Sequence, residues 1–139
     1  MKDMLEMMKY TQDIKLLYVE DNEDTKNSTM LFLDELFENI IVAPNGEDGL
    51  NKFKDNEIDL ILTDISMPKL CGLEMTKRIR EISNNIPIVV ISAYNETDYF
   101  DNSIKIGADG YIFKPIDMNQ FTSVMSRVIQ KIKLKDEVK

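Results

Sequence analysis

The sequence predicts an α/β fold, a doubly wound parallel sheet of five strands with helices on both faces. Short, nearly continuous apolar runs alternate along the 139 residues with polar-rich segments of helical spacing. Continuous apolar runs are typical of parallel strands that are buried on both faces. The connections between the segments are short, for example at 107–110, and this pattern favours right-handed βαβ crossovers.

Three strong apolar runs predict the central strands, at 14–19, 58–62 and 86–91. Two weaker runs, at 39–42 and 111–113, complete the predicted sheet. The segments between and after the strands carry apolar side chains at three- and four-residue spacing, which predicts amphipathic helices. These helical segments lie at 30–37, 49–53, 73–82, 99–106 and from Asp117 onward, with Asp117 as the expected N-cap.

The length fits one domain, which we expect to span residues 14–135. Residues 1–13 form an N-terminal extension, which is either a short amphipathic helix or a frayed segment. Residues 136–139 form a C-terminal tail.

Charge and composition exclude several classes of function. With 17 Lys and Arg against 25 Asp and Glu, the net charge is −8, which argues against direct binding to nucleic acid or an anionic membrane. The chain has one Cys and no His, so it has no internal disulfide, no Ser-His pair and no phosphohistidine of its own. No apolar run reaches the length of a membrane span and no signal peptide is evident, so we expect a cytoplasmic protein.

Reactive side chains follow four of the predicted strands. In an open α/β sheet such groups lie at the carboxyl ends of the strands, and in the flavodoxin-like order 2-1-3-4-5 the first and third strands are neighbours. Three carboxylates would then converge and repel one another unless a divalent cation, Mg²⁺ or Mn²⁺, neutralised them. The residues in question are Glu20 and Asp21 after the first strand, Asp64 after the third, Ser92 after the fourth and Lys114 after the fifth.

Each of these residues also has a simpler explanation by itself. An Asp at a strand end is most often a helix N-cap or a turn former, Ser92 could cap the next helix, and Lys114 could be a surface lysine. The combination at four successive strand ends is what predicts a site, in which Lys114 and Ser92 outline a space for an anion facing the carboxylates.

Four motifs together resemble the receiver domain of two-component response regulators, the CheY-like family. The resemblance covers nearly the whole chain and is specific as a set. The motifs are LLYVEDN at 16–22, LILTDISMPKLCGLE at 60–74, VVISAY at 89–94 and GADGYIFKPI at 107–116.

The resemblance implies a role for each matching residue. Asp64 corresponds to the phosphoacceptor and also belongs to the metal set. In that set Asp21 would be a direct ligand, Glu20 its companion acting largely through water, and the backbone carbonyl of Ser66 would complete it. Glu20 and Ser92 stand where Asp and Thr are commoner in the family, and both retain the functional group.

The resemblance also implies a switch. Ser92 corresponds to the switch hydroxyl, Lys114 to the lysine that pairs with the phosphoryl group, and Tyr111 to the aromatic residue that turns inward. The bond between Lys114 and Pro115 is expected to be cis.

The expected function is a phosphorylation-activated switch, which is not an enzyme in its own right but promotes its own phosphorylation and dephosphorylation. The donor would be a sensor histidine kinase or phosphotransfer protein, and a downstream protein or effector domain would read the surface of the fourth helix, fifth strand and fifth helix. Phosphorylation-dependent dimerisation through that surface is a further expectation. The chain is either a stand-alone receiver or one domain of a longer regulator or hybrid kinase.

Three alternatives are weaker. A phosphohydrolase with an aspartyl-phosphate intermediate would have a second Asp two residues after the nucleophile, where this chain has Ser66. A flavin carrier would need a phosphate-binding loop after the first strand, where the acidic EDNED stretch would repel phosphate. A degenerate receiver would act only as an interaction module, which an intact site does not favour.

Overall fold

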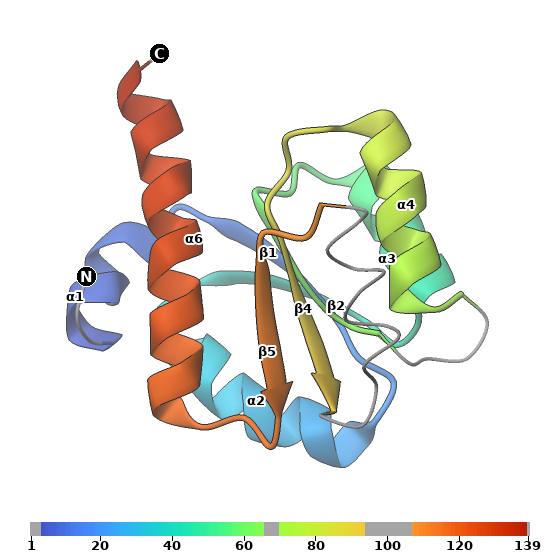
Figure 1. Cartoon of the computed structure of the whole chain (residues 1–139), viewed down its shortest axis with the longest axis horizontal. Coiled ribbons are helices and arrows are strands. Elements are labelled where there is room, and N and C mark those ends of the chain that lie inside the picture. Colours follow the sequence, from blue (N-terminus) through green and yellow to red (C-terminus); the bar gives the residue numbers. More distant parts are fainter. Residues whose placement is uncertain (1–3, 66–69, 94–106, 139) are drawn as a thin grey trace.

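The computed structural model describes residues 4–65, 70–93 and 107–138. Its centre is a five-stranded parallel sheet in the order β2-β1-β3-β4-β5, which confirms the predicted fold class and strand order (Figure 1). The strands are β1 (Lys15–Val19), β2 (Asn39–Ala43), β3 (Leu60–Asp64), β4 (Ile88–Ala93) and β5 (Gly110–Lys114).

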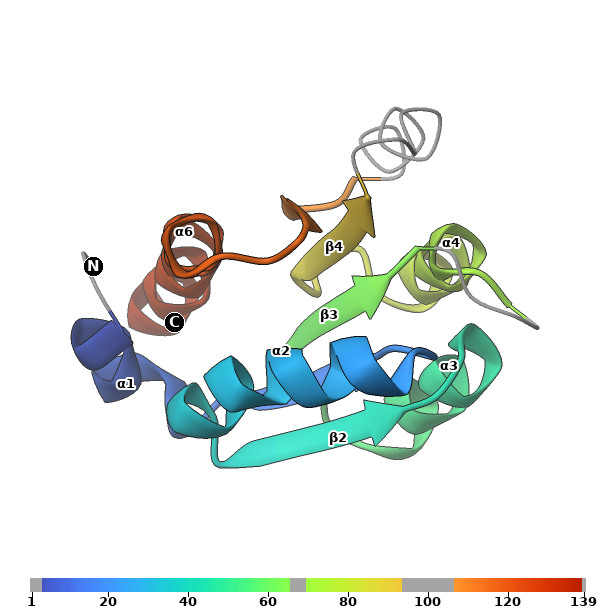
Figure 2. The same ribbon diagram turned by 90° about the horizontal axis from the view of Figure 1, so that it is seen from below.

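Helices cover both faces of the sheet (Figures 1 and 2). One face is covered by α1 (Met4–Thr11), α2 (Glu23–Leu36) and α6 (Met118–Val138). The opposite face is covered by α3 (Gly46–Asp55) and α4 (Gly72–Ile82). The helix predicted at 99–106 lies outside the described residues.

The sheet separates two hydrophobic cores, and each central strand contributes to both. In β1, Leu16 and Tyr18 face α2 and α6, whereas Leu17 and Val19 face α3 and α4. All residues of β3 are buried, which explains why this strand is a continuous apolar run in the sequence. The strand β2 lies at the edge of the sheet and is half-buried, so its sequence signal is weaker.

The strands β3 and β4 begin two residues later than the sequence predicts. Ile58 and Ile86 are apolar because they pack at the rim of the core, yet both precede their strands. Pro87 has no N–H to donate to a neighbouring strand, although its carbonyl accepts a bond from Ile61 at 3.0 Å. Apolar character alone therefore marks the buried segment and not the limits of the strand.

The helix α1, which precedes the sheet, packs against α2 and α6 (Figure 2). Met7 is fully buried in the core on this face. The hydroxyl of Thr11 donates to the carbonyl of Leu36 at the end of α2. On α6, the ammonium of Lys133 lies 5.7 Å from the ring centroid of Tyr10, which is a cation–π distance. The N-terminal helix is thus attached to the core through both neighbouring helices.

The longest helix, α6, has 21 residues and one apolar face, which includes the buried Phe121 and Met125. The side chain of Asp117 accepts a bond from the backbone N–H of Gln120 at 2.8 Å, which makes Asp117 the N-cap that the sequence predicts. Within the described part of the chain, no helix is long and apolar enough to cross a membrane.

Candidate functional site

Three acidic side chains meet at the carboxyl edge of the sheet. The strands β1 and β3 pair with Val19 opposite Thr63, so the residues that follow or end these strands lie side by side. Carboxylate oxygens of Glu20, Asp21 and Asp64 all lie within 4.8 Å of one another. The structure therefore brings together the three acids that the sequence places at neighbouring strand ends.

The backbone holds the two buried acids in place. Glu20 is 2% exposed and Asp64 4% exposed. The N–H of Asn22 donates to Oε2 of Glu20 at 3.3 Å, and the N–H of Ile65 donates to Oδ1 of Asp64 at 2.8 Å. Asp21 is exposed, so the cluster opens to solvent on its side.

Lys114 reaches the cluster from the end of β5. Its Nζ lies 3.3 Å from Oδ2 of Asp64 and 3.8 Å from Oε1 of Glu20. The peptide bond between Lys114 and Pro115 is cis, the isomer that the family resemblance implies. Among the described residues, Lys114 is the cation that pairs with the two buried acids, so the three carboxylates of the cluster together carry more negative charge than Lys114 neutralises when all are ionised.

Burial and the neighbouring charges shift the pKa values of the two buried acids. Burial, followed by the charge of Asp64, raises the pKa of Glu20 to about 8, and nearby Lys114 offsets part of that rise. Burial also raises the pKa of Asp64, against the opposing effects of its hydrogen bond with Glu20 and of Lys114. Burial next to a second carboxylate therefore favours the protonated form of Glu20 near neutral pH.

The donor set fits a hard divalent cation. It consists only of oxygen ligands, two from buried carboxylates and one from an exposed carboxylate that leaves room for water. Mg²⁺ and Mn²⁺ prefer such ligands, and either cation would favour the ionised form of these acids. Ser66, whose carbonyl the family resemblance adds to the set, lies outside the described residues.

Ser92 and Tyr111 lie on neighbouring strands close to the cluster. Ser92 is fully buried near the end of β4 and pairs with Phe113 of β5. Tyr111, two residues before Phe113 in β5, faces the same side of the sheet. The ring centroids of Tyr111 and Phe113 are 4.8 Å apart. The two switch candidates are therefore parts of one adjoining layer of side chains.

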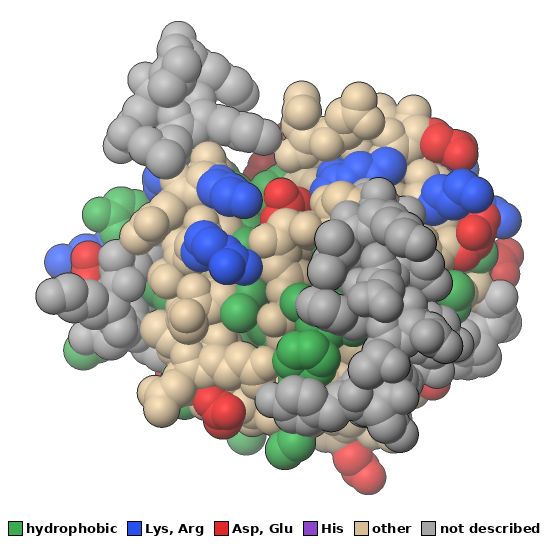
Figure 3. Space-filling view, viewed as in Figure 1, with side chains coloured by type: hydrophobic (Ala, Val, Ile, Leu, Met, Phe, Trp, Pro, Cys, Tyr) green, Lys and Arg blue, Asp and Glu red, His purple; other side chains and the backbone are tan. Residues whose placement is uncertain are grey.

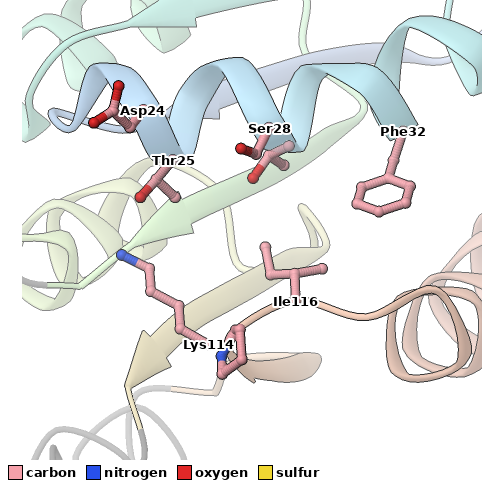
Figure 4. Close-up of a pocket in the computed structure, with 8 residues that line it drawn as sticks. Asp24, Thr25, Ser28, Phe32, Lys114 and Ile116 are labelled. Carbon is pink, nitrogen blue, oxygen red and sulfur yellow. The ribbon is translucent and has the colours of Figure 1, made fainter.

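A pocket of about 580 Å³ opens beside Lys114. Figure 4 shows one wall from α2 and the other from the connection that follows β5. Sequence reasoning missed the α2 wall, although its spacing along one helical face is a usable signal. The lining residues are Asp24, Thr25, Ser28, Thr29, Phe32, Lys114, Pro115 and Ile116.

Two glycines hold the ends of the segment that follows Asp64, and sequence reasoning missed both. The N–H of Gly46 donates to the carbonyl of Leu70 at 3.1 Å, and the N–H of Gly72 donates to the carbonyl of Ile65 at 2.7 Å. A Cβ on Gly46 would collide with the carbonyl oxygen of Leu70, and one on Gly72 with that of Asp64. Only glycine permits both close approaches.

The chain is similar to receiver domains in sequence. The family model of the response regulator receiver domain matches residues 16–126. Chemotaxis protein CheY of Halobacterium salinarum is 31% identical over 115 residues, which cover 83% of this chain and 96% of that protein. Autoinducer 1 sensor kinase/phosphatase LuxN of Vibrio campbellii is 33% identical over 120 residues, which cover 86% of this chain but only 14% of LuxN.

Solved structures share the fold of the chain. The N-terminal domain of an uncharacterized protein, WS1339, from Wolinella succinogenes superposes with a TM-score of 0.78 at 34% identity and covers 88% of this chain and 98% of that one. A CheY-like receiver domain protein from Methanospirillum hungatei has a TM-score of 0.80 at 21% identity, with 88% and 98% of the two chains covered, and supports the fold. From its sequence match and its fold together, the chain belongs to the response regulator receiver domain family of two-component systems, a family of phosphorylation switches.

Proposed function

We propose that this receiver domain accepts a phosphoryl group on Asp64 from a phosphohistidine of a partner kinase or phosphotransfer protein. The observation that carries the proposal is the surroundings of the Asp64 carboxylate. One oxygen accepts the N–H of Ile65 at 2.8 Å and the other lies 3.3 Å from the ammonium of Lys114. The carboxylate is therefore held in one orientation beside a cation, as in-line attack on phosphorus requires.

In the proposed transfer, an oxygen of Asp64 forms a bond to phosphorus as the donor's phosphorus–nitrogen bond breaks. The electron pair of the broken bond stays on the donor imidazole. Glu20, Asp21 and Asp64 would hold Mg²⁺ or Mn²⁺, which when bound neutralises charge on the carboxylates and the phosphoryl oxygens. Lys114 pairs with the transferred group from the other side, because its ammonium already lies beside Asp64.

The pocket next to Lys114 gives the donor a place to lie. Its α2 wall offers the hydroxyls of Thr25 and Ser28 and the apolar ring of Phe32, and the opposite wall includes the apolar side chain of Ile116 (Figure 4). A partner surface that combines apolar and hydrogen-bonding side chains would match these walls. Because Lys114 belongs both to the pocket and to the carboxylate cluster, a donor seated there would be close to Asp64.

We further propose that phosphorylation acts through Ser92 and Tyr111. A phosphoryl group on Asp64 adds acceptor oxygens that attract the Ser92 hydroxyl. Ser92 pairs with Phe113, whose ring touches that of Tyr111, so a movement of Ser92 reaches the surface of β5. A downstream protein, an effector domain or a second copy of the chain would read that surface together with α6 and the helix expected at 99–106, which lies outside the described residues.

The proposal divides the chain into a receiver domain at 14–135, an extension at 1–13 and a tail at 136–139. The chain spans 4% of hybrid signal transduction histidine kinase G of Dictyostelium discoideum and 48% of transcriptional regulatory protein DltR of Streptococcus agalactiae. Receiver domains of this kind thus occur in kinases and in transcriptional regulators. Both contexts are consistent with a histidine donor upstream and a protein or effector domain downstream.

Intact-mass analysis after incubation with acetyl phosphate tests the function, with and without Mg²⁺. We expect one phosphoryl adduct on the wild type that requires Mg²⁺ and is absent from Asp64→Ala. Asp55→Ala, which removes an exposed acid at the end of α3, is the matched control and should be phosphorylated like the wild type. A folded wild type that binds Mg²⁺ but gains no adduct would refute the proposal, as would an adduct that survives in Asp64→Ala.

A further inference from the structure

The side chain of Gln120 binds the backbone of β5 on its outer edge. Its amide Oε1 accepts the N–H of Phe113 at 2.7 Å, and its Nε2 donates to the carbonyl of the same residue at 3.0 Å. Because β5 is an edge strand of the described sheet, these two backbone groups point away from β4. Gln120 thus pairs with one residue of β5 much as a neighbouring strand would.

The start of α6 fixes Gln120 for this role. Its own backbone N–H donates to Oδ1 of Asp117, the N-cap of the helix, at 2.8 Å. In a capping box, the side chain of a Gln three residues after the N-cap would reach back to the N-cap backbone. Here the side chain is directed to Phe113 instead, so the first turn of α6 and the end of β5 form one hydrogen-bonded unit.

The residue after Phe113 is Lys114, the one cation that approaches the carboxylate cluster in the described structure. The lysine side chain must extend from the end of β5 across the end of β4 to reach Asp64 on β3. A long, flexible side chain keeps such a position only when its backbone anchor is fixed. Gln120 supplies an anchor one residue away through two hydrogen bonds.

We infer that Gln120 is a positioning residue, whose amide fixes β5 at Phe113 and thereby sets the Lys114 ammonium against Asp64. The inference rests on the proposed function, in which Lys114 pairs with the transferred phosphoryl group. A residue that merely covered a strand edge would contribute to stability alone. A positioning residue affects Lys114 as well, and the two roles are therefore separable by experiment.

The first measurement requires no phosphorylation. Gln120→Met keeps the length of the side chain but removes both hydrogen bonds, and Gln130→Met makes the same change at an exposed position of α6. In Gln120→Met we expect hydrogen exchange at the Phe113 amide to accelerate about 10-fold or more. The ¹³C signal of Lys114 Cε should also shift toward its position in Asp64→Ala. Neither change should occur in Gln130→Met.

The second measurement compares the binding of Mg²⁺ with the rate of phosphorylation. The proposed metal ligands lie at the ends of β1 and β3, so Gln120→Met should leave the Kd for Mg²⁺ unchanged. With acetyl phosphate at saturating Mg²⁺, its phosphorylation rate should fall about 5-fold, because the lysine is less well placed. Gln120→Glu, which keeps the acceptor for the Phe113 N–H but lacks the donor, should lie between Gln120→Met and the wild type.

A double-mutant cycle with Lys114→Ala completes the test. If Gln120 acts through Lys114, Gln120→Met should have no further effect on the rate in the Lys114→Ala background. Three results would each overturn the inference: unchanged exchange at Phe113, faster exchange without any shift of the Lys114 signal, or an equal loss of rate in both backgrounds. If the wild type gains no phosphoryl group, the proposed function fails, while the exchange and ¹³C signals still decide whether Gln120 positions Lys114.

Discussion

Acidic side chains have different surroundings at the amino edge of the sheet, where the strands begin, and at the carboxyl edge, where they end. At the amino edge, Oδ2 of Asp109 accepts the N–H of Ile88 at 2.9 Å and lies 3.1 Å from the guanidinium of Arg80. At the carboxyl edge, Glu20 and Asp64 lie close together and both pair with Lys114. Within the described residues, the acid at the amino edge thus has a cation to itself, whereas the two buried acids at the carboxyl edge share one.

The direction of the strands accounts for part of this difference. Parallel strands present N–H groups where they begin and C=O groups where they end, so a carboxylate finds donors more readily at the amino edge. Figure 3 shows Lys and Arg side chains gathered toward the end of the molecule where β4 and β5 begin. Charge is balanced there inside the chain. At the carboxyl edge the described part of the chain leaves negative charge in excess, and a bound cation would balance it.

The largest expected effect is the pH dependence of stability without a divalent cation. In the folded chain the pKa of Glu20 is raised from 4.5 to about 8. Between these values the folded chain binds more protons than the unfolded chain, so the free energy of unfolding falls as pH rises. The contribution of Glu20 to the free energy of unfolding is fully present below its pKa in the unfolded chain. It is lost as the pH rises through its pKa in the folded chain. We expect a loss of about 3 kcal/mol between about pH 5 and about pH 8.

Urea unfolding in the presence of a chelator measures this slope. Glu20→Gln should remove most of it, because the amide cannot ionise. Added Mg²⁺ should also reduce the slope, since it binds the ionised acids of the folded chain and stabilises that state increasingly as pH rises. An unchanged slope in Glu20→Gln would contradict the assignment of the raised pKa to this residue.

The next effect concerns Lys114, the lysine that pairs with Glu20 and Asp64 at the carboxyl edge. Lys114→Ala should lower the rate of phosphorylation by acetyl phosphate on the order of 100-fold at saturating Mg²⁺, because the transferred group loses its cationic partner. The rate is measured by intact-mass analysis at a temperature where the variant is folded. Lys26→Ala removes a partly buried lysine of α2 that pairs with Glu23 and serves as the control. Equal rates in the two variants would show that Lys114 does not take part in phosphoryl transfer.

A substitution at the amino edge should lower the stability of the protein but leave its phosphorylation rate nearly unchanged. Arg80 donates to the carbonyls of Ile86 and Gly107 and pairs with Asp109, and its side chain is 16% exposed. Arg80→Ala leaves these groups without their partner and should lower the free energy of unfolding by about 2 kcal/mol. The phosphorylation rate of the folded variant should stay within about 2-fold of the wild type. Denaturant unfolding and the acetyl phosphate assay check the two parts, and a large loss of rate would show that the edges are coupled.

The sequence alone predicts this carboxyl edge well. Glu20, Asp64 and Lys114 each follow or end a buried strand, and strand order is enough to bring such residues together. The limits of β3 and β4 were wrong by two residues at the start, because Ile58 and Ile86 are apolar for packing outside the strands. Periodicity reports burial, and it cannot tell the rim of a core from a strand.

Contacts made by the backbone could not be predicted in the same way. The approach of Gly46 to the Leu70 carbonyl joins the start of α3 to the residues before α4, and nothing in the sequence around a glycine indicates which group it will contact. Gln120 fits a capping box by spacing, but its side chain binds Phe113 instead. The partner of such a side chain depends on which backbone N–H and C=O groups have no neighbouring strand at the edge of the sheet. Those groups are known only once the sheet is assembled.

The smallest expected effect on stability comes from substituting Asp21, the exposed acid of the cluster. Asp21 is exposed, so Asp21→Asn should change the stability of the cation-free protein by less than about 0.5 kcal/mol. Its carboxylate is nevertheless one of the three within reach of a common cation, and its loss should weaken Mg²⁺ binding about 10-fold. Calorimetric titration with Mg²⁺ measures the affinity and urea unfolding the stability, with Asp24→Asn as a control on the nearby exposed start of α2. Equal affinities in the two variants would mean that Glu20 and Asp64 bind the cation without Asp21, and that the solvent side of the site is completed by water.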